Sequence, residues 1–110
     1  MVVLRPRLSA VLSDRPSPER VRALLGRYVP VRLDLDSAHL VPGDRRALGR
    51  LVEAATWIDR IYWRQRSEVG LQLKASLMDG KDAAARELER LLTLNFGPWD
   101  TLNDNEPFWG

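Results

Sequence analysis

The spacing of apolar residues along the chain predicts a mostly helical protein. In the stretch SPERVRALLGRY, Ser17 suits an N-cap and Pro18 suits the first helical position. One apolar helix face follows at the i, i+3, i+4, i+7 spacing: Val21, Leu24, Leu25 and Tyr28. Because Pro30 cannot continue a helix, we expect a short amphipathic helix that ends before it.

Residues 31–36 show a different period. Apolar and polar residues alternate there: Val31, Leu33 and Leu35 with Arg32, Asp34 and Asp36. Alternation with a period of two indicates an extended segment with one apolar face. No second convincing strand is present in the sequence. The segment is therefore expected to be a connector lying on helices, or an edge strand whose partner lies elsewhere.

The centre of the chain predicts one long helix. It is introduced by Pro42 and Gly43, has Asp44 as its expected N-cap, and stops at Gly80, with a bend expected near residues 67–70. One face carries most of its apolar residues: Leu48, Leu51, Val52, Ala55, Ile58 and Tyr62, widened by Ala54, Trp57 and Ile61. A helix with such a wide apolar surface is expected to be covered on two sides.

A last helix is expected from about residue 82 to residue 94, followed by an aromatic tail. The helix face consists of Ala84, Leu88, Leu91 and Leu92. The tail, residues 95–110, reads NFGPWDTLNDNEPFWG. Burying one large aromatic side chain contributes about 2–3 kcal/mol, so we expect the tail to be ordered and to pack on the helices or on a following domain.

These elements predict an all-α fold. We expect a small helical bundle with one long central helix, a short extended segment near residues 31–36 and an ordered C-terminal tail. Residues 1–110 would form a single helical domain, with residues 1–16 as an extended N-terminal arm and residues 95–110 as the aromatic tail.

Composition narrows the chemistry that the chain can perform. It has no cysteine and one histidine, His39, which excludes disulfides and thiolate zinc sites and fits a cytoplasmic location. No apolar run approaches the length of a membrane span. Residues 1–50 carry ten Arg against five acidic residues, a net charge of +5, whereas residues 51–110 have a net charge of −3. Because the arginines are scattered among acidic residues, they favour solvated helix faces over a nucleic-acid site.

Two clusters resemble reactive sites but lack the required spacing. Asp36, Ser37 and His39 are too close in sequence to form a catalytic triad, which assembles from distant segments. The acidic residues of WDTLNDNEPF lack the glycine and the terminal glutamate of a calcium loop, and more simply make turns. We therefore assign no catalytic, cofactor-binding or metal-binding residue to this chain.

The aromatic residues are better candidates for an interaction surface. The stretch TWIDRIYWRQR could stack nucleotides, but its aromatic residues lie at helical spacing and indicate a core or an interface more simply. Trp63, next to several arginines, is expected at the rim. The candidate surface comprises seven residues: Trp57, Ile61, Tyr62, Trp63, Trp99, Phe108 and Trp109. The expected partner is a second copy of the chain or a separate catalytic subunit.

Two segments also resemble a known family. The run GDRRALGRLVEAATWIDRIYWRQ, a second helix and then NFGPWDTLNDNEPF are similar to the N-terminal region of bacterial dipeptidyl peptidase III proteins, with the matching stretches at residues 58–65 and 95–108. Members of that family are two-lobed zinc metallopeptidases that remove dipeptides from peptide N-termini. The resemblance implies a helical region that packs against the rest of an enzyme. The zinc histidines have no counterpart here, so no catalytic residue is transferred.

From this resemblance we expect a non-catalytic helical interaction domain that docks to itself or to a missing catalytic part. One alternative is a subunit or fragment of a zinc-dependent dipeptidyl peptidase that contributes peptide-binding surface. A second alternative is a small nucleic-acid-binding or regulatory protein.

Overall fold

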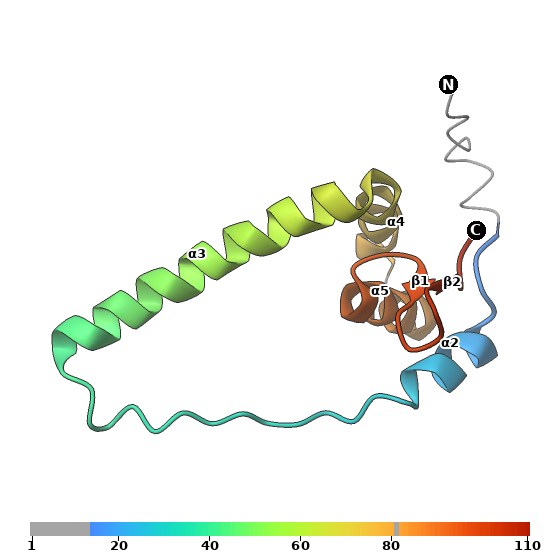
Figure 1. The fold of residues 1–110 in the computed structure, drawn as a ribbon. Coiled ribbons are helices and arrows are strands. Elements are labelled where there is room, and N and C mark those ends of the chain that lie inside the picture. The colour runs from blue at the N-terminus through green and yellow to red at the C-terminus, as the bar shows by residue number, and fades with distance from the viewer. Residues whose placement is uncertain (1–13, 81) are drawn as a thin grey trace.

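The computed structural model describes residues 14–80 and 82–110, which form four helices and a small hairpin (Figure 1). The helices are α2 (Pro18–Leu25), α3 (Pro42–Arg66), α4 (Glu68–Met78) and α5 (Ala83–Asn95). Strands β1 (Trp99–Asp100) and β2 (Glu106–Pro107) pair antiparallel, with Trp99 opposite Pro107. The mostly helical fold predicted from the sequence is confirmed. Of the predicted N-terminal arm, residues 1–13 lie outside the described residues.

Helix α2 begins as its sequence predicts. The Ser17 hydroxyl accepts a hydrogen bond from the Arg20 N–H at 3.2 Å, and Pro18 occupies the first helical position. Val21 is buried, and Leu24 and Leu25 pack against the core. The predicted apolar face therefore joins α2 to the rest of the fold.

The predicted central helix is split into two. Ser67 has an extended backbone (φ −167°, ψ 117°). Its N–H still donates to the Trp63 carbonyl and closes α3, while its hydroxyl accepts from the Gly70 N–H at 2.9 Å and caps α4. The expected bend is thus a complete interruption, because one serine ends the first helix and starts the next. At the other end, α3 begins at Pro42 and not after Asp44, since the proline ring presets φ for a first helical turn.

Three helices and the hairpin form a compact lobe. Helix α5 packs against both α2 and α4, and β1 lies against α5. Phe108 and Trp109 fold back into this core, so the predicted ordered tail is confirmed. Among the described residues, the core consists of ten buried side chains: Val21, Trp63, Leu73, Leu77, Ala85, Leu88, Leu91, Leu92, Phe108 and Trp109.

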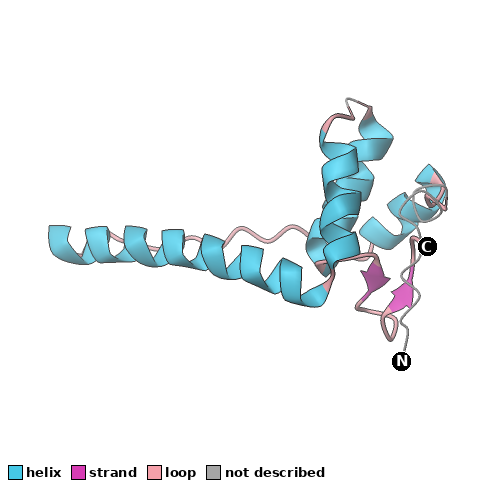
Figure 2. Ribbon diagram, turned by 90° about the horizontal axis from the view of Figure 1, so that it is seen from above, coloured by secondary structure: helices cyan, strands magenta, loops and turns pink. Residues whose placement is uncertain are grey.

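Helix α3 projects away from the lobe, and an extended connector, residues 26–41, returns from its far end to α2 (Figure 1). The view from above shows α3 standing apart from the other helices along most of its length (Figure 2). The extended segment predicted at residues 31–36 is confirmed. The expectation that α3 would be covered on two sides is wrong within the described residues, because among the α3 residues only Trp63 in the last turns is buried.

None of the described helices is sufficiently long and apolar to cross a membrane.

Candidate docking surface

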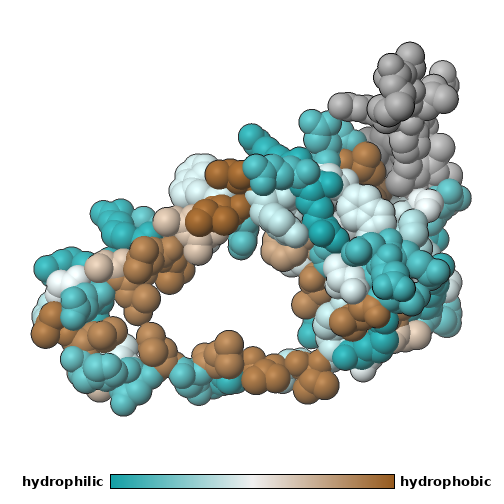
Figure 3. All heavy atoms as spheres, viewed as in Figure 1, coloured by the Kyte–Doolittle hydropathy of each residue, from teal (hydrophilic) through white to brown (hydrophobic). Residues whose placement is uncertain are grey.

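The connector and α3 border an open space, and apolar side chains line both sides of it (Figure 3). We call residues 29–62 the arm. Eleven of its large apolar side chains are exposed, from 42% for Tyr62 to 91% for Leu33. The exposed set on the connector is Val29, Val31, Leu33, Leu35 and Val41, and on α3 it is Leu51, Val52, Trp57, Ile58, Ile61 and Tyr62.

The exposed apolar side chains of the arm are more concentrated than those of an ordinary monomer surface. Eleven of them occur within 34 residues, on both the connector and α3, whereas exposed apolar residues of a typical monomer are scattered singly. Such a concentration is typical of a protein–protein contact surface.

An open apolar pocket lies at the far corner of the arm. Its lining includes Leu35, His39 and Leu40 of the connector and Leu48 and Leu51 of α3. The Asp36 carboxylate accepts a hydrogen bond from the Ala38 N–H at 3.0 Å, and the Arg45 guanidinium donates to the Ser37 carbonyl at 3.0 Å. These bonds close the turn that leads into α3 and direct Leu35 toward the helix.

At its other end the connector is tied to the hairpin by an ion pair. The Arg27 guanidinium donates to Asp100 Oδ1 at 2.7 Å, and the Asp100 side chain is almost fully buried. The hydrogen bond from Arg27 holds the pKa of the Asp100 carboxyl below its usual range, and the N–H of Leu102 adds to this effect. The same bond raises the pKa of Arg27. Both groups therefore remain charged near neutral pH, and the base of the connector is fixed on the lobe.

A buried amide completes this junction. Asn95 Oδ1 accepts hydrogen bonds from the N–H and the hydroxyl of Thr101, at 3.0 and 2.8 Å, and from the Tyr28 hydroxyl at 3.2 Å. Asn95 Nδ2 donates to the Leu91 carbonyl at 3.0 Å. One side chain thus joins the end of α5, the hairpin and the start of the connector.

The seven predicted interaction residues separate into two groups. Trp57, Ile61 and Tyr62 lie exposed on the arm, although Tyr62 also contacts Phe96 edge to face, with ring centroids 4.9 Å apart. Trp99 is half-buried in the hairpin. Trp63, Phe108 and Trp109 lie in the core instead, so Trp63 is not at the rim, as had been expected. Sequence reasoning did not include Leu33 and Leu35 in this surface, although their alternation was visible.

The charges of the arm balance one another. Residues 29–62 carry five Arg and five acidic residues, a net charge of zero. The Arg60 guanidinium stacks on Trp57, 4.7 Å from the ring centroid. Net charge therefore does not prevent one arm from contacting another.

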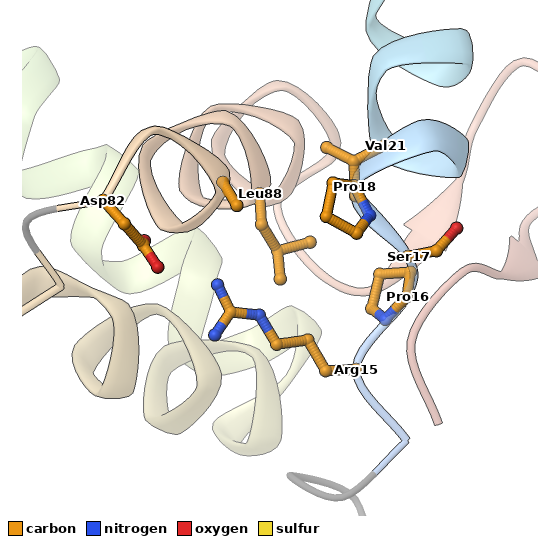
Figure 4. Close-up of a pocket in the computed structure, with 8 residues that line it drawn as sticks. Arg15, Pro16, Ser17, Pro18, Val21, Asp82 and Leu88 are labelled. Carbon is orange, nitrogen blue, oxygen red and sulfur yellow. The ribbon is translucent and has the colours of Figure 1, made fainter.

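A second depression lies at the seam between α2 and α5 (Figure 4). Its wall includes Pro16, Pro18 and Leu88, and Arg15 reaches across it toward Asp82. The Asp82 carboxylate already accepts the Ala85 N–H at 2.8 Å as the cap of α5. The residues around this pocket therefore serve to join two helices.

The acidic residues of the hairpin, which resembled a calcium loop in the sequence, make an ion pair and a turn. In the hairpin, Asp100 pairs with Arg27, and Asp104 and Asn105 form a tight turn with positive φ angles of 49° and 59°. Within residues 14–80 and 82–110, no three His, Asp or Glu side chains are grouped closely enough to hold a metal ion.

Comparison with curated proteins finds a partial similarity. The chain is 36% identical over 88 residues to Nudix hydrolase 3 of Arabidopsis thaliana, a match that covers 76% of this chain and 11% of that protein. The chain thus spans roughly a tenth of the length of this curated relative. No family model and no solved structure matches the chain.

This comparison corrects the expected family. The similarity is to a region of Nudix hydrolase 3, so the assignment to the dipeptidyl peptidase III family is wrong. The function expected as part of a dipeptidyl-peptidase-like protein, and its zinc-peptidase and nucleic-acid alternatives, are corrected as well. The expected protein partner is not tested by this similarity and stays a prediction. The structure supplies a physical reason. In the stretch 95–108, Asn95 holds the hairpin on α5 and Phe108 fills the core, so these residues report how the chain packs and not which reaction it serves.

Proposed function

We propose that the chain is an assembly module of a hydrolase of the Nudix hydrolase 3 kind. The lobe is the folded support, and the arm is the surface that another polypeptide covers in the working protein. The eleven exposed apolar side chains of the arm are the observation that carries this proposal, because such a concentration of exposed apolar residues is typical of interaction sites.

The way in which the arm is attached supports the same proposal. The Arg27–Asp100 pair fixes the connector at one end, and Trp63 in the core fixes α3 at the other. A surface whose ends are held in place loses less conformational freedom on binding than a free peptide does, which favours association. The cytoplasmic location that the cysteine-free sequence predicts is part of this proposal.

Hydrogen exchange tests whether the arm is covered. The chain would replace the 88-residue tract that it matches in Arabidopsis Nudix hydrolase 3, and exchange in this chimera would be compared with the isolated chain at low concentration. We expect the amides of residues 48–62 to exchange at least about tenfold more slowly in the chimera, and those of α5 to change little because α5 is already packed.

Two variants that each add one carboxylate sharpen this test. Leu51→Glu places a charge on the apolar face and should remove the protection. Thr56→Glu, an exposed position about 140° away around the helix, should retain it. Equal exchange of the arm in the chimera and in the dilute isolated chain would contradict the proposed function.

A further inference from the structure

The connector has the properties of an unpaired edge strand. From Val29 to Leu35 no backbone N–H or C=O group hydrogen-bonds to any residue that the structure describes. The apolar residues at 29, 31, 33 and 35 alternate with polar or proline positions, and all seven residues are exposed. An extended segment with free backbone groups and one apolar face can accept a second strand along its edge.

The charge pattern of this segment is complementary to itself. When two copies run antiparallel with Leu33 opposite Leu33, Val31 lies opposite Leu35, and Arg32 lies opposite Asp34 in both directions. Moving the register by one residue places apolar side chains opposite polar ones. Moving it by two residues places Arg32 opposite Arg32, or Asp34 opposite Asp34. Among these registers, only the one with Leu33 opposite Leu33 places apolar residues opposite apolar ones and opposite charges opposite each other at every position from 31 to 35.

The backbone favours the same arrangement. Successive residues of a strand direct their N–H groups to opposite edges. On the edge formed by residues 30, 32, 34 and 36, one N–H donor is missing because Pro30 has none. On the other edge, residues 31, 33 and 35 each have an N–H donor. With Leu33 opposite Leu33 as a hydrogen-bonded pair, residues 31 and 35 are also hydrogen-bonded. Arg32 and Asp34 then occupy the non-hydrogen-bonded positions, at which opposite side chains are closer.

We infer that the polypeptide covering the arm is a second copy of this chain, joined by antiparallel pairing of the two connectors about Leu33. This inference rests on the proposed function. The paired connectors form a two-stranded ribbon with Val31, Leu33 and Leu35 of each copy on one face. An isolated two-stranded ribbon is marginally stable, and packing against a helix is one way to stabilise it. Leu35 already lines the corner pocket together with Leu48 and Leu51 of α3.

The role of the charges is to select the register. In one copy alone, Arg32 Nε lies 2.8 Å from Asp34 Oδ1, and this pair is exposed. Dimer formation exchanges two such internal pairs for two pairs between copies, so the number of ion pairs is unchanged. The apolar contacts and the backbone hydrogen bonds provide the affinity.

Charge reversal tests this arrangement directly. The single variants Arg32→Asp and Asp34→Arg each place like charges opposite one another at both cross-strand positions. Sedimentation equilibrium of the 12.6-kDa chain should show a monomer–dimer equilibrium, and each variant alone should dimerise at least about tenfold more weakly.

An equimolar mixture of the two variants is the decisive sample. The carboxylate introduced by Arg32→Asp then faces the guanidinium introduced by Asp34→Arg, and the unchanged Asp34 of the first variant faces the unchanged Arg32 of the second. Heterodimers should therefore form with about wild-type affinity. Neither variant retains the internal pair between residues 32 and 34, so recovery in the mixture must come from contacts between the chains. Circular dichroism of each variant checks that the helices are intact.

The sedimentation results and the exchange results together decide between a second copy and another polypeptide. Recovery in the mixture supports the inference. Unchanged dimerisation of either single variant, or no recovery in the mixture, overturns it. A wild-type chain that stays monomeric while the chimera protects the arm also overturns the inference, because the covering polypeptide is then the rest of the hydrolase and the proposed function stands.

Discussion

At the scale of single residues, two polar side chains join the arm to the lobe. Asn95 is buried and receives three hydrogen bonds at one oxygen atom, and Asp100 is buried against Arg27. Buried polar groups are stabilising only while their partners are present, because an unpaired group has lost its contacts with water. Substituting either residue therefore tests the junction between the connector and the lobe.

Replacing Asn95 by Ala should lower the free energy of unfolding by about 1–3 kcal/mol, since the N–H of Thr101 loses its acceptor in a partly buried place. Urea unfolding followed by circular dichroism measures this change. Thr93→Ala, at an exposed position of the same helix, should change stability by less than about 0.5 kcal/mol. Equal stability of the two variants would contradict the importance of the Asn95 hydrogen bonds.

Asp100 should make stability depend on acid pH. Because its pKa is lower in the folded state than in the unfolded chain, its stabilising effect is complete above the unfolded pKa, near 4, and is lost as pH falls toward the folded pKa. Asp100→Asn should be less stable at pH 7 and should lose less stability between pH 5 and pH 2.5 than the wild type. The exposed Asp59→Asn is the control. Parallel acid profiles for wild type and Asp100→Asn would refute this prediction.

At the scale of elements, the ends of the helices were predictable where a side chain caps them. Ser17 caps α2 as predicted, and Asp82, the predicted start of the last helix, is the cap of α5. The period of two located the extended connector. The division at Ser67 was visible only as a bend, because Ser67 can be a helix residue or a cap, and packing decides between them. A local sequence pattern therefore predicts a helix end when a nearby side chain accepts the backbone hydrogen bond that caps the helix.

Burial was harder to predict than helix formation. Trp57 is 62% exposed and Trp63 is 5% exposed, although both belong to the wide aromatic stretch of one helix. The difference arises because α4 turns back at Ser67 and presents Gly70, where an added Cβ would lie 3.4 Å from the Trp63 ring. The spacing of apolar residues within α3 does not show where α4 packs against it. The candidate surface predicted from the sequence therefore included both core residues and exposed ones.

Gly97 and Gly49 allow the same substitution to be compared at a crowded and at an open position of the backbone. Gly97 follows α5 with φ at 153°, and an added Cβ would lie 2.7 Å from the Trp99 ring. Gly97→Ala should therefore destabilise the chain by at least about 1–3 kcal/mol. Gly49→Ala, in α3 with nothing within 4 Å, should instead stabilise α3 by up to about 1 kcal/mol. Thermal unfolding distinguishes the two, and equal effects of the same sign would contradict the structure of both sites.

At the scale of the whole molecule, the arm makes the shape unusually open. The Cα radius of gyration is 17.4 Å, compared with about 13 Å for a compact chain of this length. The lobe holds the core, and the arm adds length with little additional packing. Lobe and arm should therefore differ in their resistance to proteolysis.

Trypsin at low protein concentration should cleave after Arg32 before it cleaves within the helices, because Arg32 lies in an exposed extended segment. The two products should stay together in gel filtration, since α2 packs against α5 across the cut. Mass spectrometry identifies the cleavage site, and urea should separate the products. Separation without denaturant would contradict the packing of α2 on the lobe.

The connector has a mechanical consequence for α3. Its sixteen residues can span at most about 53–58 Å, and the 25-residue helix beside it is about 37 Å long. The turn at residues 37–40 leaves eleven residues before it, which span about 36–40 Å, so little slack remains. The connector therefore acts as a tether whose length sets the tilt of α3 from the lobe. Deleting one apolar and one polar residue together would keep the alternation but remove about 7 Å. The helix would then have to swing inward or unwind its first turn.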